Sequence, residues 1–125
     1  MTDTQNRRRT LLVVDDQAEF LQLVRSRLTR EQTLDVVAEA TSGEAALDLV
    51  PRLEPCPDGV LLDVEMPGLD GFETARRLRV LLPTLRIILT SASDTPRYGV
   101  AAGRIGASFL PKRQLTAQAV LHLLD

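Results

Sequence analysis

The chain has 125 residues, a length that allows one ordinary domain. Apolar residues make up 44% and charged residues 26%, as is typical of globular domains, and no apolar run is long enough to span a membrane. The formal net charge of −2 argues against a domain that binds nucleic acid by itself. The single cysteine, Cys56, excludes an internal disulfide and the polar N-terminus lacks a signal-peptide pattern, so we expect a cytoplasmic protein.

Short apolar runs alternate with helical patterns along the whole chain. The predicted strands are 11–14, 34–40, 60–62, 85–89 and 107–110, and each is followed by a helix, at 20–28, 41–50, 72–82, 96–105 and 114–124 respectively. Two capping-box patterns, Asp16 with Glu19 and Thr41 with Glu44, predict where the first two helices begin. Pro51 is expected to end the second helix.

Five strands alternating with five helices predict an α/β fold with a parallel sheet covered on both faces. Right-handed crossovers leave few topologies, and the flavodoxin-like (βα)5 doubly wound sheet with strand order 2-1-3-4-5 is the common one at this size. We expect this single domain to occupy residues 10–125, after a flexible and solvated tail at 1–9.

Polar side chains follow four of the predicted strands at the point where each strand ends. Asp15 and Asp16 end the first strand, Asp63 the third and Thr90 the fourth, and Lys112 follows the fifth. In the predicted order these strands are neighbours, and ligands of such sheets bind beyond the carboxyl ends of the strands. The pattern therefore predicts that all five groups converge on one crevice.

The chemistry of these groups points to a metal and a phosphoryl group. Three crowded carboxylates repel one another, and a hard divalent cation with oxygen ligands, above all Mg²⁺, relieves the repulsion. Lys112 and the Thr90 hydroxyl are suited to phosphoryl oxygens, which leaves Asp63 as a nucleophile that forms an acyl phosphate.

Four segments in order, LLVVDD, LLDVEMPGLDGFE, IILTSAS and GASFLPK, resemble the response-regulator receiver family of bacterial two-component systems. The resemblance covers about Thr10 to Leu124, and the segment FLPKRQL is most similar to receivers of the NarL/FixJ type, which usually carry a DNA-binding output domain.

The resemblance implies a set of metal ligands. Asp63 would be the phosphoacceptor of a sensor histidine kinase, and Asp16 and Asp63 would bind Mg²⁺, or Mn²⁺ in its place, through their side chains. Glu65 would bind the metal through its backbone carbonyl and Asp15 through a water molecule.

It also implies a switch. Thr90 and Lys112 would hold phosphoryl oxygens, Phe109 would turn inward as Thr90 moves, and the surface around the fourth helix, fifth strand and fifth helix would change. The implied partners are an output domain or downstream protein, and a second copy of the chain. The domain would phosphorylate and dephosphorylate itself without being a metabolic enzyme. Arg113 stands where many receivers have proline, and Ser91 where a small alanine is common.

Other readings stay open at this point. Asp15 and Asp16 are also explained by a strand end with a helix cap, Thr90 by a strand terminus and Phe109 by an ordinary core position.

The last helix has more apolar residues than one buried stripe needs, which predicts contact with another subunit or an output domain. The alternative functions are a receiver-like interaction module that works without phosphorylation and a small Mg²⁺-dependent phosphatase. A P-loop enzyme is excluded because no Walker sequence follows the first strand.

Overall fold

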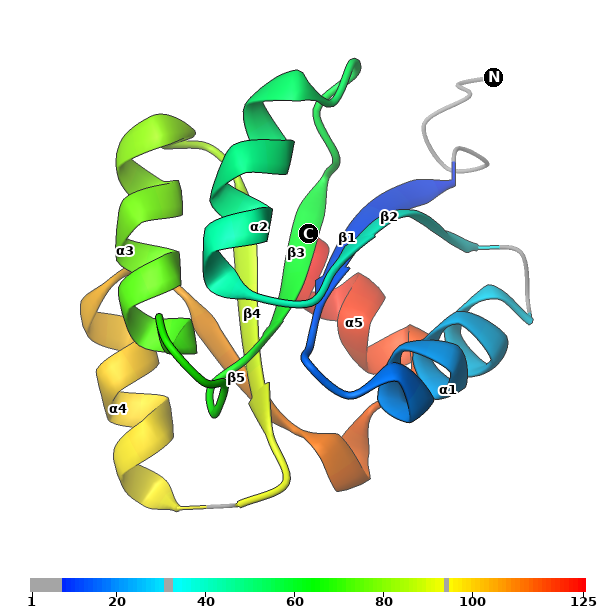
Figure 1. The fold of residues 1–125 in the computed structure, drawn as a ribbon. Helices are drawn as coiled ribbons and strands as arrows, with labels where there is room; N and C mark the ends of the chain where they lie inside the picture. The colour runs from blue at the N-terminus through cyan, green and yellow to red at the C-terminus, as the bar shows by residue number, and fades with distance from the viewer. Residues whose placement is uncertain (1–7, 31–32, 94) are drawn as a thin grey trace.

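The computed structural model describes residues 8–30, 33–93 and 95–125. Strands and helices alternate along the chain as expected (Figure 1). The strands are β1 (Arg9–Val14), β2 (Leu34–Ala40), β3 (Gly59–Asp63), β4 (Arg86–Ser91) and β5 (Ser108–Pro111). The helices are α1 (Ala18–Thr29), α2 (Gly43–Leu49), α3 (Gly71–Leu81), α4 (Pro96–Arg104) and α5 (Ala117–Leu124), with short 3₁₀ turns at Val50–Arg52 and Lys112–Gln114.

The five strands form one parallel sheet in the order β2-β1-β3-β4-β5, which confirms the predicted doubly wound fold. The β3 and β4 strands run in register from Gly59 opposite Arg86 to Asp63 opposite Thr90. Because all the strands are parallel, their carboxyl ends lie at one edge of the sheet. This edge is at the bottom in Figure 1.

Each face of the sheet has its own core, because successive strand side chains point to opposite faces. One core joins the sheet to α2, α3 and α4, and the other joins it to α1 and α5 (Figure 1). On β3, for example, Val60 and Leu62 belong to the first core and Leu61 to the second, and all three are fully buried. Burial of each such side chain stabilises the fold by about 1.5–3 kcal/mol, so two-sided burial accounts for the continuous apolar runs in the sequence.

Two predicted helix starts are shifted in the structure. The first helix is preceded by Gln17 rather than Asp16, and no side chain caps it. Asp15 Oδ1 instead accepts a hydrogen bond from the Gln17 backbone N–H at 2.9 Å, which bends the chain before the helix begins. The second helix is capped by Ser42 rather than Thr41, through a bond from the Ala45 N–H at 3.0 Å. The capping-box predictions were therefore wrong in detail, because no side chain caps the first helix and Ser42, a neighbour of Thr41, caps the second.

The last helix also begins later than predicted. Residues 112–114 form the 3₁₀ turn, and Thr116 caps α5 by accepting a hydrogen bond from the Ala119 N–H at 3.0 Å. The apolar residues of α5 that exceed one stripe, Leu121 and Leu123 among them, are only partly buried against the α1/α5 core. The predicted contact with another subunit or an output domain stays a prediction.

The N-terminal boundary differs by one residue from the expected one. Arg9, which was assigned to the tail, opens β1, donates its N–H to the Thr33 carbonyl and forms an ion pair with Asp125. The predicted tail otherwise lies largely outside the described residues, which begin at residue 8. No helix within the described ranges is long and apolar enough to cross a membrane.

Candidate functional site

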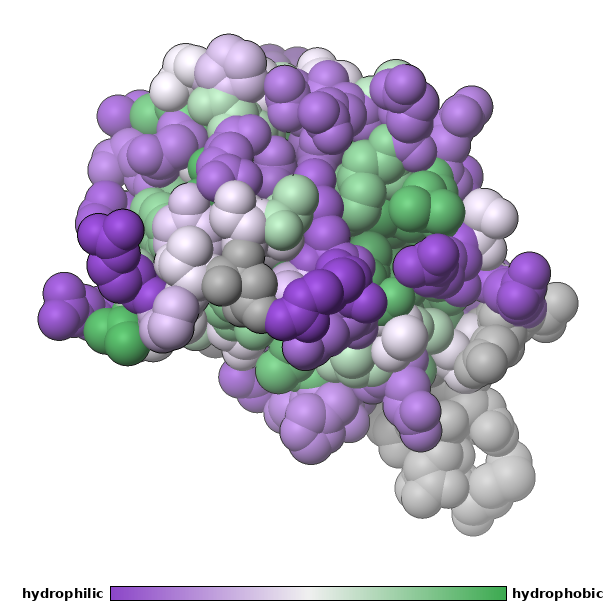
Figure 2. All heavy atoms as spheres, turned by 90° about the horizontal axis from the view of Figure 1, so that it is seen from below, coloured by the Kyte–Doolittle hydropathy of each residue, from purple (hydrophilic) through white to green (hydrophobic). Residues whose placement is uncertain are grey.

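The carboxyl ends of the strands bring together the polar side chains that the sequence places there. This face of the molecule is mostly hydrophilic, with smaller apolar areas between the polar groups (Figure 2). Asp15 and Asp16 directly follow β1, and Asp63 is the last residue of the neighbouring β3. Thr90 pairs with Asp63 across β3 and β4, and Lys112 directly follows β5.

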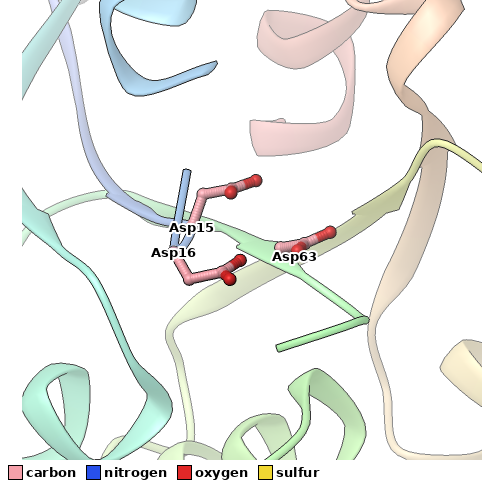
Figure 3. Close-up of side chains that lie close together, drawn as sticks. All are labelled: Asp15, Asp16 and Asp63. Atoms are coloured by element: carbon pink, nitrogen blue, oxygen red, sulfur yellow. The ribbon is translucent and has the colours of Figure 1, made fainter. Parts of the chain in front are cut away.

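The side chains of Asp15, Asp16 and Asp63 lie close together near the ends of β1 and β3 (Figure 3). Asp15, Asp16 and Asp63 each offer one oxygen, and these oxygens all lie within 4.8 Å of one another. Asp15 and Asp63 are buried and Asp16 is exposed, so the cluster opens to solvent on one side. A set of oxygen ligands with an open side that admits water is the kind of site that a hard cation such as Mg²⁺ prefers. The residues present therefore fit a divalent cation.

Lys112, the only lysine of the chain, supplies positive charge to the cluster. Its Nζ lies 2.8 Å from Asp15 Oδ2 and 3.6 Å from Asp63 Oδ1. The same ammonium group lies 3.9 Å from the centroid of the Phe20 ring, a cation–π contact from the first turn of α1. Sequence reasoning missed Phe20 as a neighbour of the site, because no local pattern connects α1 to the residue after β5.

The environment of Asp63 raises the pKa of its carboxyl to about 6. Burial is the main cause, and the nearby Asp15 carboxylate adds to it, with a smaller contribution from Asp16. Lys112 and a backbone hydrogen bond from Glu65 act in the opposite direction. Asp63 is therefore still mainly ionised at neutral pH, but its charge is destabilised until a cation neutralises the cluster.

The Thr90 hydroxyl is buried and has no hydrogen-bond partner among the residues that the structure describes. An unsatisfied buried hydroxyl costs about 1–3 kcal/mol, so the group is available to an oxygen-bearing ligand at no further desolvation cost. Thr90 also donates no bond to Asp63, although the two residues are paired across the strands.

Gly71 was not identified as a site residue by sequence reasoning, but the shape of the site depends on it. Its N–H donates to the Val64 carbonyl at 2.9 Å, which closes the loop between Asp63 and α3. A Cβ at this position would lie 2.3 Å from the Asp63 carbonyl oxygen and 2.7 Å from the Val64 Cα. Because both neighbours are backbone atoms, a larger residue would displace the end of β3.

The side chain of Glu65 points away from the carboxylate cluster. Its Oε1 accepts a hydrogen bond from Ser91 Oγ at 2.8 Å, and its Oε2 accepts one from the Tyr98 hydroxyl at 3.0 Å. These bonds, led by the one from Ser91, lower the pKa of the Glu65 carboxyl, whereas the carboxylate raises the pKa of the Tyr98 phenol. Phe109 is partly buried, and its ring packs edge-on against Tyr98 at 5.6 Å.

The fold and the acidic cluster together define a signalling domain, and comparison with known proteins gives its family. The response regulator receiver domain family matches residues 11–123, so the chain belongs to that family. It is a receiver domain of two-component systems and is similar to the receiver domains of NarL-type regulators.

Two of the similar proteins are transcriptional regulatory proteins. The transcriptional regulatory protein NarL of Mycobacterium tuberculosis (strain H37Rv) is 37% identical over 127 residues, which cover 100% of this chain and 57% of the relative. DegU of Brevibacillus brevis is 30% identical over 112 residues, 90% of this chain and 47% of the relative. The solved signal receiver domain of M. tuberculosis NarL has a TM-score of 0.84 at 34% identity, over 94% of this chain and 97% of that one. The chain thus spans about half the length of these regulators.

Proposed function

We propose that the chain is a phosphorylation switch in which a sensor histidine kinase transfers a phosphoryl group to Asp63 in a Mg²⁺-dependent reaction. The observation that carries the proposal is the cluster of three carboxylates within 4.8 Å, with Lys112 at 2.8 Å and 3.6 Å from two of them. A structural role alone does not explain a cluster that stores like-charge repulsion. A bound divalent cation would relieve this repulsion and would attract phosphoryl oxygens.

The metal would be held by the side chains of Asp16 and Asp63 and by the backbone carbonyl of Glu65, with Asp15 acting through a water molecule. When bound, Mg²⁺, or Mn²⁺ in its place, neutralises the cluster and the phosphoryl oxygens. The open side of the cluster at the exposed Asp16 supports this assignment, because a hard cation of this kind keeps several water ligands.

In the transfer step an Asp63 carboxylate oxygen attacks the phosphorus of the kinase phosphohistidine. A P–O bond to Asp63 forms as the P–N bond to the imidazole breaks, and the histidine leaves with its electron pair. Lys112 and the buried Thr90 hydroxyl, which has no partner among the described residues, hold phosphoryl oxygens, so positioning and charge stabilisation supply most of the catalysis. The ionised state of Asp63 at neutral pH supports its role as nucleophile.

Phosphorylation of Asp63 then changes a surface of the domain away from the site. Thr90 moves toward the phosphoryl oxygen, Phe109 turns into the space beside it, and the surface around α4, β5 and α5 changes its partner. The partner is an output domain or a downstream protein, and a second copy of the chain is a further candidate. The half-length match to transcriptional regulators supports a DNA-binding output in a cytoplasmic protein. The domain reverses its own phosphorylation but does not turn over a metabolite.

The test is the intact mass of the wild type and of Asp63→Asn after incubation with acetyl phosphate, with and without Mg²⁺. We expect the wild type to gain one phosphoryl group only in the presence of Mg²⁺, and the variant to gain none. A wild type that gains no mass and binds no Mg²⁺ would contradict the proposal and favour an interaction module that works without phosphorylation.

A further inference from the structure

A second polar connection joins the ends of β3 and β4 to α4. Glu65, two residues after Asp63, accepts a hydrogen bond at each carboxylate oxygen, from Ser91 Oγ at 2.8 Å and from the Tyr98 hydroxyl at 3.0 Å. Ser91 is fully buried and directly follows Thr90. Its Oγ also accepts a bond from the Ser93 N–H at 2.9 Å, which fixes the hydroxyl on Glu65. The Glu65 carboxylate therefore ties the first turn of α4 to both strands of the site.

The Tyr98 ring is held by packing as well as by the exposed hydrogen bond of its hydroxyl. It packs edge-on against Phe72 of α3 and Phe109 of β5, with a centroid distance of 5.6 Å to each. The rest of α4 has few such anchors, because Ala102 is its only buried residue and Val100 is 58% exposed. Tyr98 is thus a main attachment of α4 to the body of the domain.

Building on the proposed phosphorylation of Asp63, we propose that Glu65, Ser91 and Tyr98 form a latch that holds α4 closed in the unphosphorylated protein and opens on phosphorylation. The latch is separate from the metal ligands and phosphoryl-binding groups, since it involves the Glu65 side chain and not the Glu65 carbonyl. It makes the position of α4 depend on the state of the site.

Three consequences of phosphorylation weaken this latch. The phosphoryl group adds negative charge two residues from the Glu65 carboxylate, and like charges repel. Movement of Thr90 toward the phosphoryl group carries Ser91 with it, because the two residues are neighbours on β4. Inward movement of Phe109 removes one of the two rings that hold Tyr98. The first two effects act on the Glu65 carboxylate and its bond to Ser91, and the third acts on the Tyr98 ring, so together they weaken both ends of the latch.

Tyr98 is also a built-in reporter, because the chain has one tyrosine and no tryptophan. A hydrogen bond from a phenol to a carboxylate quenches tyrosine fluorescence. We expect the emission of the full chain to rise with the phosphorylated fraction when acetyl phosphate and Mg²⁺ are added, and to fall as the phosphoryl group is lost. Asp63→Asn should show no change.

Intact mass on the same samples separates the two proposals. Complete phosphorylation with unchanged emission would overturn the latch and leave the phosphorylation of Asp63 intact. If the wild type gains no phosphoryl group, the proposed function fails, and the phosphorylation-driven latch fails with it.

A second experiment removes only the hydroxyl of the latch. Tyr98→Phe keeps the ring between Phe72 and Phe109, and we expect amide hydrogen exchange in residues 96–104 to rise about 3- to 10-fold without phosphorylation. Phosphorylation should then add less than it does in the wild type. Val100→Thr, an exposed change in the same helix, is the matched control and should leave the exchange unaltered.

Exchange in α4 of Tyr98→Phe at the wild-type rate would overturn the latch. Should Tyr98→Phe lower the thermal unfolding temperature of the whole domain, Ser91→Ala provides the same test from the β4 side. It removes the other hydrogen bond to Glu65 and should raise exchange in α4 in the same way.

Discussion

The two ends of the parallel sheet differ in how well their polar groups are paired. At the carboxyl ends of the strands, Asp15, Asp16 and Asp63 crowd three carboxylates together, and the Thr90 hydroxyl is buried without a partner among the described residues. At the amino ends of the strands, by contrast, the polar side chains of Arg79, Asp58 and Thr10 all form hydrogen bonds. The Arg79 guanidinium donates to the carbonyl oxygens of residues 83, 85 and 106 at 3.0, 2.6 and 2.7 Å, and so joins α3 to the turns before β4 and β5.

A second matched pair at the amino end joins β1 to the turn before β3. Asp58 accepts the Thr10 N–H at 2.8 Å, and the Asp58 N–H donates to Thr10 Oγ1 at 3.0 Å. Hydrogen bonds at the amino ends hold the strands in place. The carboxyl ends can therefore keep crowded carboxylates and a hydroxyl that has no partner among the described residues for a ligand. Separation of stability and function in this way is a common consequence of the trade-off between them.

The largest effect is expected at the unmatched end. Lys112→Met removes the cation nearest to Asp15 and Asp63 but keeps most of the side-chain stem. Because loss of one charge-stabilising group typically costs about 10²–10³ in rate, we expect phosphorylation by acetyl phosphate to slow by about that factor. The measurement is intact mass against time. Lys112→Arg, which keeps the charge with a different shape, should retain more activity, and a wild-type rate in Lys112→Met would contradict the role of the lysine.

The next effect is expected at the matched end. Arg79→Ala removes four charge-assisted hydrogen bonds to carbonyl oxygens, and we expect the free energy of unfolding to fall by about 2–4 kcal/mol. Urea unfolding followed by circular dichroism measures it. Arg76→Ala on the same helix removes only an exposed pair with Glu73 and should cost less than about 0.5 kcal/mol. If both variants lose the same free energy of unfolding, the hydrogen bonds of Arg79 do not stabilise the amino ends of the strands.

The smallest expected effect is a gain in the free energy of unfolding rather than a loss. Since the folded state raises the pKa of Asp63 from 3.8 to about 6, the folded protein binds the proton more tightly than the unfolded chain does. The resulting stability is present below about pH 4 and is lost as the pH rises through 6. Asp63→Asn should therefore be more stable than the wild type at pH 7.5 without Mg²⁺, by about 1–3 kcal/mol.

Urea unfolding at pH 4 and pH 7.5 in the presence of a chelator tests this prediction. The difference between Asp63→Asn and the wild type should shrink toward pH 4, and added Mg²⁺ should shrink it at pH 7.5 by stabilising only the wild type. If Asp63→Asn is less stable than the wild type at pH 7.5, the buried charge of Asp63 does not destabilise the folded protein.

Much of the fold was predictable because its signals are local. The central strands β1, β3 and β4 are buried on both faces along most of their length, so 11–14 and 60–62 appear as short continuous apolar runs with a polar residue at the end. The helix starts were predicted less well. Ser42 shows why, since it caps the second helix in place of its neighbour Thr41, and only the backbone geometry decides between two such candidates.

The sequence by itself predicted the strand order and the edge of the sheet at which the polar groups meet, because five alternating βα units favour one common topology and parallel strands all end at the same edge. Only the tertiary structure decided which groups touch. Phe20 against Lys112, and Tyr98 against Glu65, are contacts between segments 92 and 33 residues apart in the chain. No local pattern encodes such contacts, because they depend on how helices pack against the sheet.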